Sequence, residues 1–401
     1  MSASPRPTII FGAFDRHNLG DMLFAHVLQA LLAPRPLAFA GLIDADLRGC
    51  GGHRVHALRR LALRLPGANL VHAGGEILSC DAPLAAAMLL PPRQAQDLLP
   101  QDDAPYADRL AWARQRLGMP DLAPYVAGRD AIPQGAALLH NAVGGADLDS
   151  AEPALREEVR RKLAQADVVT VRDARSAAAL AGLGIASRLL PDPVCLLREL
   201  FGAPIAQRAR QGEVAAARAG FADGYLAVQC SADFGDDATL SAMAAGLEAL
   251  ARARGLGIVF FRAGAALWHD ELETLQRLKA RMRMPAMLMT SLDIVDICAL
   301  IAASRGYLGS SLHGRIVAMA YALPRANLLF PGTHNANNSA KHDAYAAIWE
   351  APGLPTALAV SDIPEAMRAA LDAAPRTLED LARAHAAIYR SGFAQLRAML
   401  Q

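Results

Sequence analysis

The sequence GYLGSSLHGRIVAMAYALP, residues 306–324, joins a short apolar run to a segment with helical periodicity. Residues 306–309 read as the end of a buried strand, and Ile316, Val317 and Ala320 recur at helical spacing. His313 is therefore predicted in the first turn of a helix that follows a strand. Ligands of α/β proteins bind at the carboxyl ends of parallel strands, and helix starts offer unpaired N–H groups that suit anions.

The residue types in this turn indicate a site for an anion next to a proton donor. Ser310 and Ser311 supply hydroxyls, His313 supplies an ionisable imidazole, and Arg315 supplies a positive charge. Together they suit a phosphate or a carboxylate. Simple helix capping is an equally good interpretation of the same turn, because Ser310 or Ser311 can accept hydrogen bonds from first-turn N–H groups. The turn alone leaves both interpretations open.

The composition is that of a globular protein with large apolar cores. The chain has 401 residues, of which 53% are hydrophobic and 20% are charged. A total of 40 basic and 39 acidic residues gives a net charge of +1, so there is no electrostatic case for a nucleic-acid binder. The five cysteines are scattered and form no C-x-x-C pair, which indicates a reducing compartment and no disulfide frame.

The sequence contains no signal for export or membrane insertion that we recognise. Residues 1–7 lack the apolar core of a signal peptide, and no run of 18 or more apolar residues occurs. We therefore expect a cytoplasmic protein.

Short apolar runs alternate with longer periodic segments along most of the chain, which implies parallel sheets with right-handed crossovers. We predict an α/β fold of two doubly wound, Rossmann-like domains facing a cleft, the default place for a ligand. The predicted first domain covers residues 1–205, with a proline-rich helical insertion at about 82–134. A linker at 206–223, a second domain at 224–375 and a C-terminal helix at 376–401 follow, and this helix could pack back across the first domain.

The first predicted strand is followed by the loop Asn18-Leu19-Gly20-Asp21. Gly20 permits close backbone approach, and Asn18 can orient a ligand hydroxyl or carboxylate. Asp21 either binds a ligand or caps the next helix, and a negative cap would compete with an anion. The loop has neither the G-x-G-x-x-G nor the G-x-x-x-x-G-K-[ST] pattern, so neither dinucleotide nor P-loop binding is indicated.

Later strand ends of the first domain carry three more candidates. Gly74-Gly75-Glu76 either lets a ligand approach the backbone or forms a tight turn. The guanidinium of Arg172 can bind a carboxylate or phosphate through two parallel hydrogen bonds, or it can pair with the aspartate beside it. Asp192, in a rigid Pro-Asp-Pro turn, could face the cleft, although a purely structural turn is the simpler interpretation.

In the second domain, Arg262 ends a predicted strand and His269 suits a ligand hydroxyl, with Asp270 as the cap of the next helix. Lys341 follows a polar segment that reads as a solvated loop. The histidines and arginines of residues 53–64 read as a basic helical face on the surface. No H-E-x-x-H or G-x-S-x-G pattern occurs, so neither a metal site nor a serine hydrolase is indicated.

The order of these motifs resembles that of the polysaccharide pyruvyl transferases. The pattern comprises N-x-G-D, a glycine-rich turn, V-R-D-x-x-S, D-P, S-x-L-H-G before a helix, and a late K-x-x-x-Y. In this chain the motifs begin at Asn18, Ala73, Val171, Asp192, Ser310 and Lys341. Two positions depart from the family. Ser311 stands where many members have arginine, and Ala73 and Glu76 stand where members often have glycine and asparagine.

The resemblance implies a two-domain fold like that of GT-B glycosyltransferases and a role in exopolysaccharide biosynthesis. It implies transfer of a pyruvyl group from phosphoenolpyruvate onto two hydroxyls of a sugar, which forms a cyclic ketal. Phosphoenolpyruvate is then the donor substrate, and no cofactor or metal is expected. The expected acceptor is a saccharide, which could be lipid-linked. No nucleic acid and at most a peripheral membrane contact are expected.

The chemistry of this donor assigns roles to the candidate residues. Protonation of the methylene carbon builds positive charge at the adjacent carbon, where a sugar hydroxyl attacks, and an imidazole suits this proton transfer near neutral pH. We hypothesise that His313 is the general acid and that Arg172 and Arg315 hold the anionic groups. The predicted substrate-binding residues are Asn18, Gly20, Asp21, Gly74, Gly75, Glu76, Asp192, Arg262, His269, Ser310, Ser311 and Lys341.

Two other functions fit parts of the sequence. A GT-B glycosyltransferase would use a nucleotide sugar, but such enzymes usually carry a glutamate in this turn region, whereas residues 309–323 contain no acidic residue. A non-catalytic relative in glycan assembly is compatible with Ser311 in place of the family arginine. If the acceptor is lipid-linked, Leu58–Leu65 with its arginines is a weak candidate for contact with the membrane interface.

Overall fold

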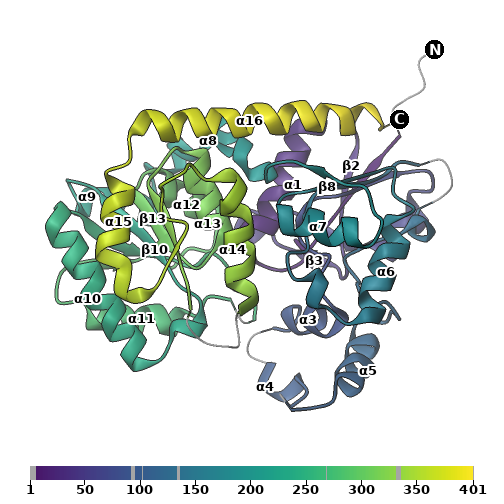
Figure 1. The fold of residues 1–401 in the computed structure, drawn as a ribbon, viewed down its shortest axis with the longest axis horizontal. Helices are drawn as coiled ribbons and strands as arrows, with labels where there is room; N and C mark the ends of the chain where they lie inside the picture. Colours follow the sequence, from purple (N-terminus) through teal and green to yellow (C-terminus); the bar gives the residue numbers. More distant parts are fainter. Residues whose placement is uncertain are drawn as a thin grey trace. The chain divides into compact units, whose positions relative to one another are not determined.

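The computed structural model describes residues 6–91, 95–101, 103–132, 136–267, 269–330 and 336–400. The chain divides into two compact units, which are coloured along the sequence in Figure 1. Unit 1 comprises Met1–Pro193 and Ile388–Gln401, and unit 2 comprises Val194–Ala387. Helix α16 (Pro375–Ala398) therefore contributes residues to both units, and the end of the chain returns to the first one.

Unit 1 is built on a largely parallel sheet with the strand order β3-β4-β2-β1-β5-β7-β8-β9, and β6 pairs with β7. Among the described strands, the β3–β4 pair is antiparallel and the other pairs are parallel. The strands are β1 (Thr8–Phe11), β2 (Leu37–Gly41), β3 (Ala45–Asp46), β4 (Arg54–Ala57), β5 (Asn69–His72), β6 (Gly75–Glu76), β7 (Leu138–Gly144), β8 (Val168–Val171) and β9 (Arg188–Leu189).

The central strands of this sheet are buried, which explains why they read as continuous apolar runs. One apolar core joins Ile9, Leu70 and Leu138 of the sheet to leucines of the neighbouring helices, including Leu61 and Leu180. The helices of unit 1 are α1 (Leu19–Leu32), α2 (Leu58–Arg64), α3 (Ala82–Met88), α4 (Ala95–Leu98), α5 (Tyr106–Leu117), α6 (Pro153–Leu163) and α7 (Ala174–Gly182).

Two histidines lie side by side inside this core. The rings of His72 on β5 and His140 on β7 stack with 3.7 Å between centroids and an interplanar angle of 14°. The Nε2 atom of His72 accepts a hydrogen bond of 2.9 Å from the N–H of Ala127, so His72 anchors a buried loop to the sheet. Burial lowers the pKa of His72 to about 3 and holds that of His140 well below its usual value.

Unit 2 contains a parallel sheet with the strand order β12-β11-β10-β13-β14-β15. Its strands are β10 (Tyr225–Gln229), β11 (Gly257–Phe260), β12 (Ala286–Leu288), β13 (Gly306–Gly309), β14 (Arg325–Leu328) and β15 (Ala357–Leu358). Its helices are α8 (Leu197–Arg208), α9 (Gly212–Gly220), α10 (Asp237–Arg254), α11 (Leu272–Arg281), α12 (Ile294–Ala302), α13 (Leu312–Ala320), α14 (Ala336–Trp349) and α15 (Ile363–Leu371).

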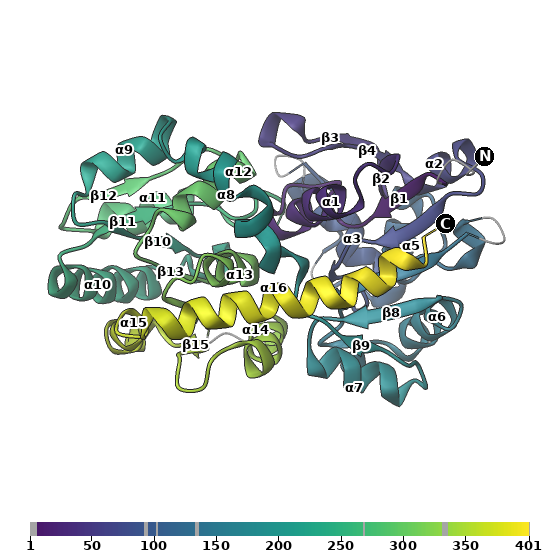
Figure 2. The same ribbon diagram turned by 90° about the horizontal axis from the view of Figure 1, so that it is seen from above.

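Helices lie on both faces of the second sheet, as a doubly wound fold requires (Figure 2). On one face, α10 and α15 pack over Val228, Phe260 and Leu308. The helices α8, α12 and α13 contact one another in a second layer. The predicted α/β fold with parallel sheets in two Rossmann-like domains is confirmed.

The division between the units lies earlier than the sequence analysis placed it. The predicted boundary was at residue 205, whereas the units separate between Pro193 and Val194. Residues 206–223, predicted as a linker, contain the end of α8 and all of α9, and these helices belong to unit 2. The mixture of Gly, Ala and Arg that reads as a loose linker forms short helices because Ile205 and Val214 are buried. The predicted insertion corresponds to α3, α4, α5 and a 3-10 turn (Arg129–Ala131) in the described part of residues 82–134.

No helix in the described residues is long and apolar enough to cross a membrane. The described residues also contain no group of three or more His, Cys, Asp or Glu side chains that could hold a metal ion.

The buried histidine pair predicts that acid unfolds the protein. An unfolded histidine takes up a proton below a pH of about 6.5, whereas the folded pair resists protonation, so the folded state loses stability as the pH falls from about 6.5 toward 3. We expect each histidine to contribute about 1.4 kcal/mol per pH unit in this range, measured by urea unfolding at pH 7 and pH 5.

The matched variants are His140→Leu, at the buried position, and His56→Gln, at a half-buried position. His140→Leu is expected to flatten the dependence of stability on pH, and His56→Gln to leave it in place. An unchanged slope in His140→Leu would contradict this account.

Candidate functional site

The turn that carries His313 lies at the carboxyl end of β13. Ser311 is the N-cap of α13, and its Oγ atom accepts a hydrogen bond of 3.2 Å from the N–H of Gly314. His313 is the second residue of the helix and is half-buried. Ser311 therefore performs the capping that the sequence left open, while the imidazole of His313 lies in the first turn of the helix.

The turn packs tightly on one aromatic ring. The hydroxyl of Tyr307 donates a hydrogen bond of 2.9 Å to the carbonyl oxygen of Ser311. A Cβ atom placed on Gly314 would lie 2.5 Å from the ring and hydroxyl of Tyr307, closer than any real contact. The glycine after His313 is thus explained by the ring beneath it, because no side chain fits between helix and strand.

The side-chain amide of Gln229 connects this turn to a neighbouring loop, and the Oγ atom of Ser310 accepts a further hydrogen bond of 2.9 Å from the N–H of Ser231. Gln229, the last residue of β10, donates from Nε2 to Asp270 Oδ1 at 2.7 Å and to Ser310 Oγ at 3.3 Å. Its Oε1 atom accepts from the N–H of Ser311 at 2.9 Å. An ionised carboxylate can only accept, so Asp270 determines which end of the Gln229 amide faces the turn.

Asp270 is buried and does not cap a helix, which corrects the sequence interpretation. Helix α11 begins at Leu272 after the N-cap Glu271. Asp270 instead accepts from the N–H of Ala263 at 2.5 Å and fixes the loop after β11. Burial raises the pKa of Asp270 to about 7, although its hydrogen bonds oppose this shift.

Arg262 and His269 lie in the same loop after β11. The Nη2 atom of Arg262 lies 3.5 Å from the carbonyl oxygen of Thr290, and burial lowers the pKa of Arg262 while the charge of Asp270 opposes this shift. The carbonyl oxygen of His269 accepts from the N–H of Ala232, in the loop after β10, at 3.0 Å. The loops after β10, β11 and β13 are therefore joined by hydrogen bonds at the carboxyl end of three adjacent strands.

Arg315 does not point toward this edge, and its predicted role as a ligand for the donor's anionic groups is corrected. The residue is completely buried. Its guanidinium pairs with Glu350, donates to the carbonyl oxygen of Thr356 at 2.6 Å, and donates to Asn327 Oδ1 at 3.2 Å. Arg325 pairs with the same carboxylate at 2.6 Å. Arg315 thus stabilises the fold behind the turn.

Lys341 lies on α14 in the same unit and is half-buried. The polar segment before it, predicted as a solvated loop, is residues 334–338. Residues 334 and 335 lie outside the described residues, whereas 336–338 begin α14, so the loop prediction is wrong there.

In unit 1, the loop after β1 begins α1. Asn18 is the N-cap and accepts from the N–H groups of Gly20 at 3.1 Å and Asp21 at 3.2 Å. Asp21 is therefore not the cap; it lies in the first turn, where its Oδ2 atom accepts from Arg16 at 3.4 Å. The side-chain amide of Asn18 caps α1, and this role explains the asparagine without any bound ligand.

The glycine-rich turn lies next to this loop. Gly74 and Gly75 have φ angles of +128° and +94°, which other residues rarely adopt. A Cβ atom on Gly75 would lie 3.0 Å from Oδ1 of Asp21. The structure therefore brings the two predicted motifs of unit 1 together, at the carboxyl ends of β1 and β5.

Arg172, Glu76 and Asp192 form one ion-pair cluster, a second correction to the predicted roles. Arg172 pairs with Oε2 of Glu76 at 2.9 Å and with Oδ2 of Asp192 at 3.1 Å. The side chain of Arg172 is 2% exposed and that of Asp192 is fully buried. A guanidinium committed to two carboxylates is not available to hold an incoming anion, and Asp192 does not face a ligand.

The structure also shows residues that the sequence analysis missed. In unit 1, the buried Asp15 accepts from the hydroxyl of Tyr125 at 2.8 Å and from the N–H of Leu42 at 2.6 Å. In unit 2, Gln229 and Tyr307 hold the His313 turn. A glutamine ending an apolar strand was the one available signal, since a polar side chain in a buried strand needs a partner.

The family comparison tests the resemblance that the motifs indicated. Residues 131–326 match the family model described as Polysaccharide pyruvyl transferase. The match includes the Arg172 junction, the Asp192 turn and the complete His313 turn. The resemblance predicted from the sequence is confirmed for this part of the chain.

A comparison with curated proteins found no significant match. Among solved structures, S. aureus MnaA in its UDP co-structure has a TM-score of 0.51 at 10% identity, covering 94% of this chain and 90% of that one. A structure from Listeria monocytogenes, named for a proposed UDP-N-acetylglucosamine 2-epimerase, has a TM-score of 0.51 at 11% identity and 98% coverage of both chains. The glycosyltransferase SnogD from Streptomyces nogalater has a TM-score of 0.44 at 15% identity and full coverage of both.

At these identities the likeness to MnaA and the Listeria protein shows the fold alone. It agrees with the predicted fold of two Rossmann-like domains.

The packing under the pyruvyl transferase motif predicts that Gly314→Ala destabilises the protein. Alanine is normally better than glycine inside a helix by about 1 kcal/mol, but the added methyl would collide with Tyr307. We expect a net loss of about 1–3 kcal/mol, measured by urea unfolding.

The matched control is Gly182→Ala at the end of α7, where an added Cβ meets nothing within 4 Å. This variant should be neutral or slightly more stable than the parent protein. Equal effects of the two substitutions would show that Tyr307 does not restrict the turn.

Proposed function

We propose that this protein transfers a pyruvyl group from phosphoenolpyruvate onto two hydroxyls of a saccharide, with release of inorganic phosphate. The family match supports a polysaccharide pyruvyl transferase. The observation that carries the proposal within this family is the position of His313. Its half-buried imidazole lies in the first turn of α13, at the carboxyl end of β13, inside the matched residues.

The reaction needs a proton at one carbon and nucleophiles at the next. His313 donates its proton to the methylene carbon of phosphoenolpyruvate, which makes the adjacent carbon electrophilic. One sugar hydroxyl adds to that carbon and forms a C–O bond. The second hydroxyl then replaces the phosphate oxygen, and the C–O bond to phosphate breaks. One of the two hydroxyl protons returns to His313 and the other goes to the departing phosphate, so one ketal and one hydrogen phosphate account for all atoms and charges of the substrates.

The anionic groups of the donor need partners other than Arg172 and Arg315, because both are ion-paired within the fold. The first-turn N–H groups of α13 suit a phosphate or carboxylate, and the partial positive charge of the helix start adds to this. Arg262 is partly exposed in the loop joined to this turn through Asp270 and Gln229. We assign the donor's anionic groups to these elements of unit 2.

The saccharide acceptor follows from the proposed family reaction. A nucleotide-sugar-dependent glycosyltransferase is the second candidate, favoured by the fold that this chain shares with MnaA in its UDP co-structure. The two functions differ in the donor, so the donor decides between them.

The proposed function is tested by incubating the protein with phosphoenolpyruvate and nucleotide-linked or lipid-linked sugar acceptors. We expect release of inorganic phosphate that depends on the acceptor, and a product heavier by one pyruvyl ketal in mass spectrometry. Thermal stabilisation by UDP with none by phosphoenolpyruvate, together with release of a nucleoside diphosphate from a nucleotide sugar, would support the alternative.

In this assay, His313→Gln is expected to lower the rate of phosphate release by at least about 100-fold, because the proton donor is removed. His56→Gln, far along the chain in unit 1, serves as the histidine control and should keep full activity. Near-parental turnover by a His313→Gln protein with an unchanged unfolding midpoint would exclude His313 as the general acid.

A further inference from the structure

The charges of this chain are unevenly distributed along the sequence. Residues 47–75 contain five arginines and no aspartate or glutamate, although the whole chain has a net charge of only +1. The segment includes β4, α2 and β5. Two of the five arginines, Arg48 and Arg60, pair with Asp46 and Asp44 just before this segment, so the other three carry its excess positive charge.

Helix α2 carries both basic and apolar residues to the surface. Leu58 and Leu61 are buried in the core of unit 1, as expected for an amphipathic helix. Leu63 is 84% exposed, about twice as exposed as any other large apolar side chain recorded as exposed in the described residues. Its isobutyl group is an exposed apolar surface next to the arginines of the same helix.

Arginines surround this leucine on the helix. Arg59 and Arg60 lie four and three residues before Leu63, which places them on the same helical face, and Arg64 follows it. Arg59 donates to the carbonyl oxygens of Gly118 and, at 3.1 Å, Leu117, so neutral groups hold it in place and leave its charge available. Arg60 pairs with Asp44.

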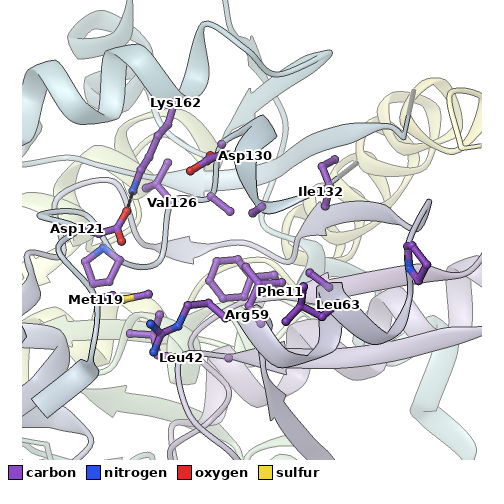
Figure 3. Close-up of a pocket in the computed structure, with 18 residues that line it drawn as sticks. Phe11, Leu42, Arg59, Leu63, Met119, Asp121, Val126, Asp130, Ile132 and Lys162 are labelled. Carbon is purple, nitrogen blue, oxygen red and sulfur yellow. Dashed lines mark hydrogen bonds and ion pairs between the residues drawn. The ribbon is translucent and has the colours of Figure 1, made fainter. Parts of the chain in front are cut away.

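A cavity of about 590 Å³ lies beneath the same helix. Figure 3 shows it, with Leu63 and Arg59 among its lining side chains and the Lys162–Asp121 pair on the opposite side. The remaining walls are largely apolar, formed by Phe11, Leu42, Leu58, Met119, Val126 and Ile132. Since Leu63 is both exposed and part of the lining, the cavity reaches the surface at this residue.

Apart from Arg59, the charged side chains in the cavity lining are Lys162, Asp121 and Asp130. Lys162 Nζ lies 2.7 Å from Asp121 Oδ1 and 2.6 Å from Glu158 Oε1, so this lysine is ion-paired within the fold. The arginines of α2 lie at the rim, while most of the interior walls offer apolar contact. Arg6, also exposed, donates to the carbonyl oxygen of Gly67 at 3.4 Å and adds a further positive charge beside the rim residue Pro66.

We propose that α2 and the cavity beneath it dock this protein onto the surface of an anionic lipid bilayer. Leu63 enters the interface between headgroups and acyl chains, Arg59 and Arg64 contact lipid phosphates, and one acyl chain lies against the apolar cavity walls. Interfacial helices combine these features, an apolar residue that leaves water and cations that meet anionic headgroups. The inference does not depend on the proposed catalytic function.

Charge complementarity favours a lipid surface over other occupants. A second copy of the chain meeting α2 with its own α2 would place arginines against arginines. A nucleic acid would use the arginines but would leave Leu63 and the apolar cavity without a role. An anionic bilayer uses both the charge and the apolar surface.

The test is co-sedimentation of the full-length protein with vesicles of phosphatidylglycerol and phosphatidylcholine. We expect binding to vesicles rich in phosphatidylglycerol, weak binding to pure phosphatidylcholine, and release as the salt concentration rises. Leu63→Ser should lower the partition constant between water and vesicles at least about tenfold, because the apolar side chain that enters the bilayer interface is lost. The control Leu189→Ser, at a leucine that is 38% exposed, should bind like the parent protein.

Two further variants separate insertion from simple adsorption. Leu63→Trp should keep binding, and its added fluorescence should be quenched by lipids with brominated acyl chains. Arg64→Glu should lower the preference for phosphatidylglycerol. The proposal is overturned if the protein binds no vesicles, or if Leu63→Ser binds like the parent protein. It is also overturned if duplex DNA binds as tightly as the vesicles, or if Leu63→Ser changes the oligomeric state in sedimentation.

Discussion

The side-chain amide of Gln229 joins the loops that follow three adjacent strands of unit 2. Its oxygen accepts from the Ser311 N–H, its nitrogen donates to Asp270, and Asp270 in turn holds Ala263. The hydrogen bonds from Gln229 Nε2 and from the N–H of Ala263 require that Asp270 accepts on both carboxylate oxygens. A protonated Asp270 would place its own O–H group opposite one of these two N–H donors, and that hydrogen bond would be lost. Burial nevertheless favours the protonated form and raises the pKa of Asp270 to about 7. The geometry of the His313 turn is thus coupled to one ionisable group 43 residues earlier in the chain.

Buried ion pairs fix the arginines that sequence reasoning would give to a ligand. Arg172 has two carboxylate partners in unit 1, and Arg315 shares Glu350 with Arg325 in unit 2. Burial opposes ionisation of Glu350, but Arg325 and Arg315 lower its pKa below the usual value. A buried guanidinium without such partners would cost several kcal/mol of stability, so these pairs are required wherever the fold encloses an arginine. An arginine near a strand end is therefore weak evidence for an anion site.

The sequence predicts what depends on local pattern. The bounds of β10 and β13 follow from short apolar runs, and the start of α13 follows from the serine and the helical spacing after it. The boundary between the units is harder to predict from the sequence, because the Gly- and Ala-rich residues after Arg208 form a helix only through the burial of Val214. Interaction partners that are distant in the sequence cannot be predicted from local pattern. Nothing near Arg315 in the sequence indicates Glu350, and nothing near Asp270 indicates Gln229, so the roles of these residues had to come from the structure.

The geometry of α13 explains why the side chain of His313 is half-buried whereas that of Arg315 is fully buried. Two residues on an α-helix are separated by about 200° of rotation, so positions i and i+2 face nearly opposite directions. Arg315 is directed inward, toward Asn327 on β14 and the carboxylate of Glu350. Once that side of the helix is fixed in the core, the imidazole two residues earlier must lie on the other side, where it is half-buried. The arginine in the turn thus contributes to the site by setting the rotation of the helix that presents the histidine. Its position two residues after His313 is what makes this indirect role possible.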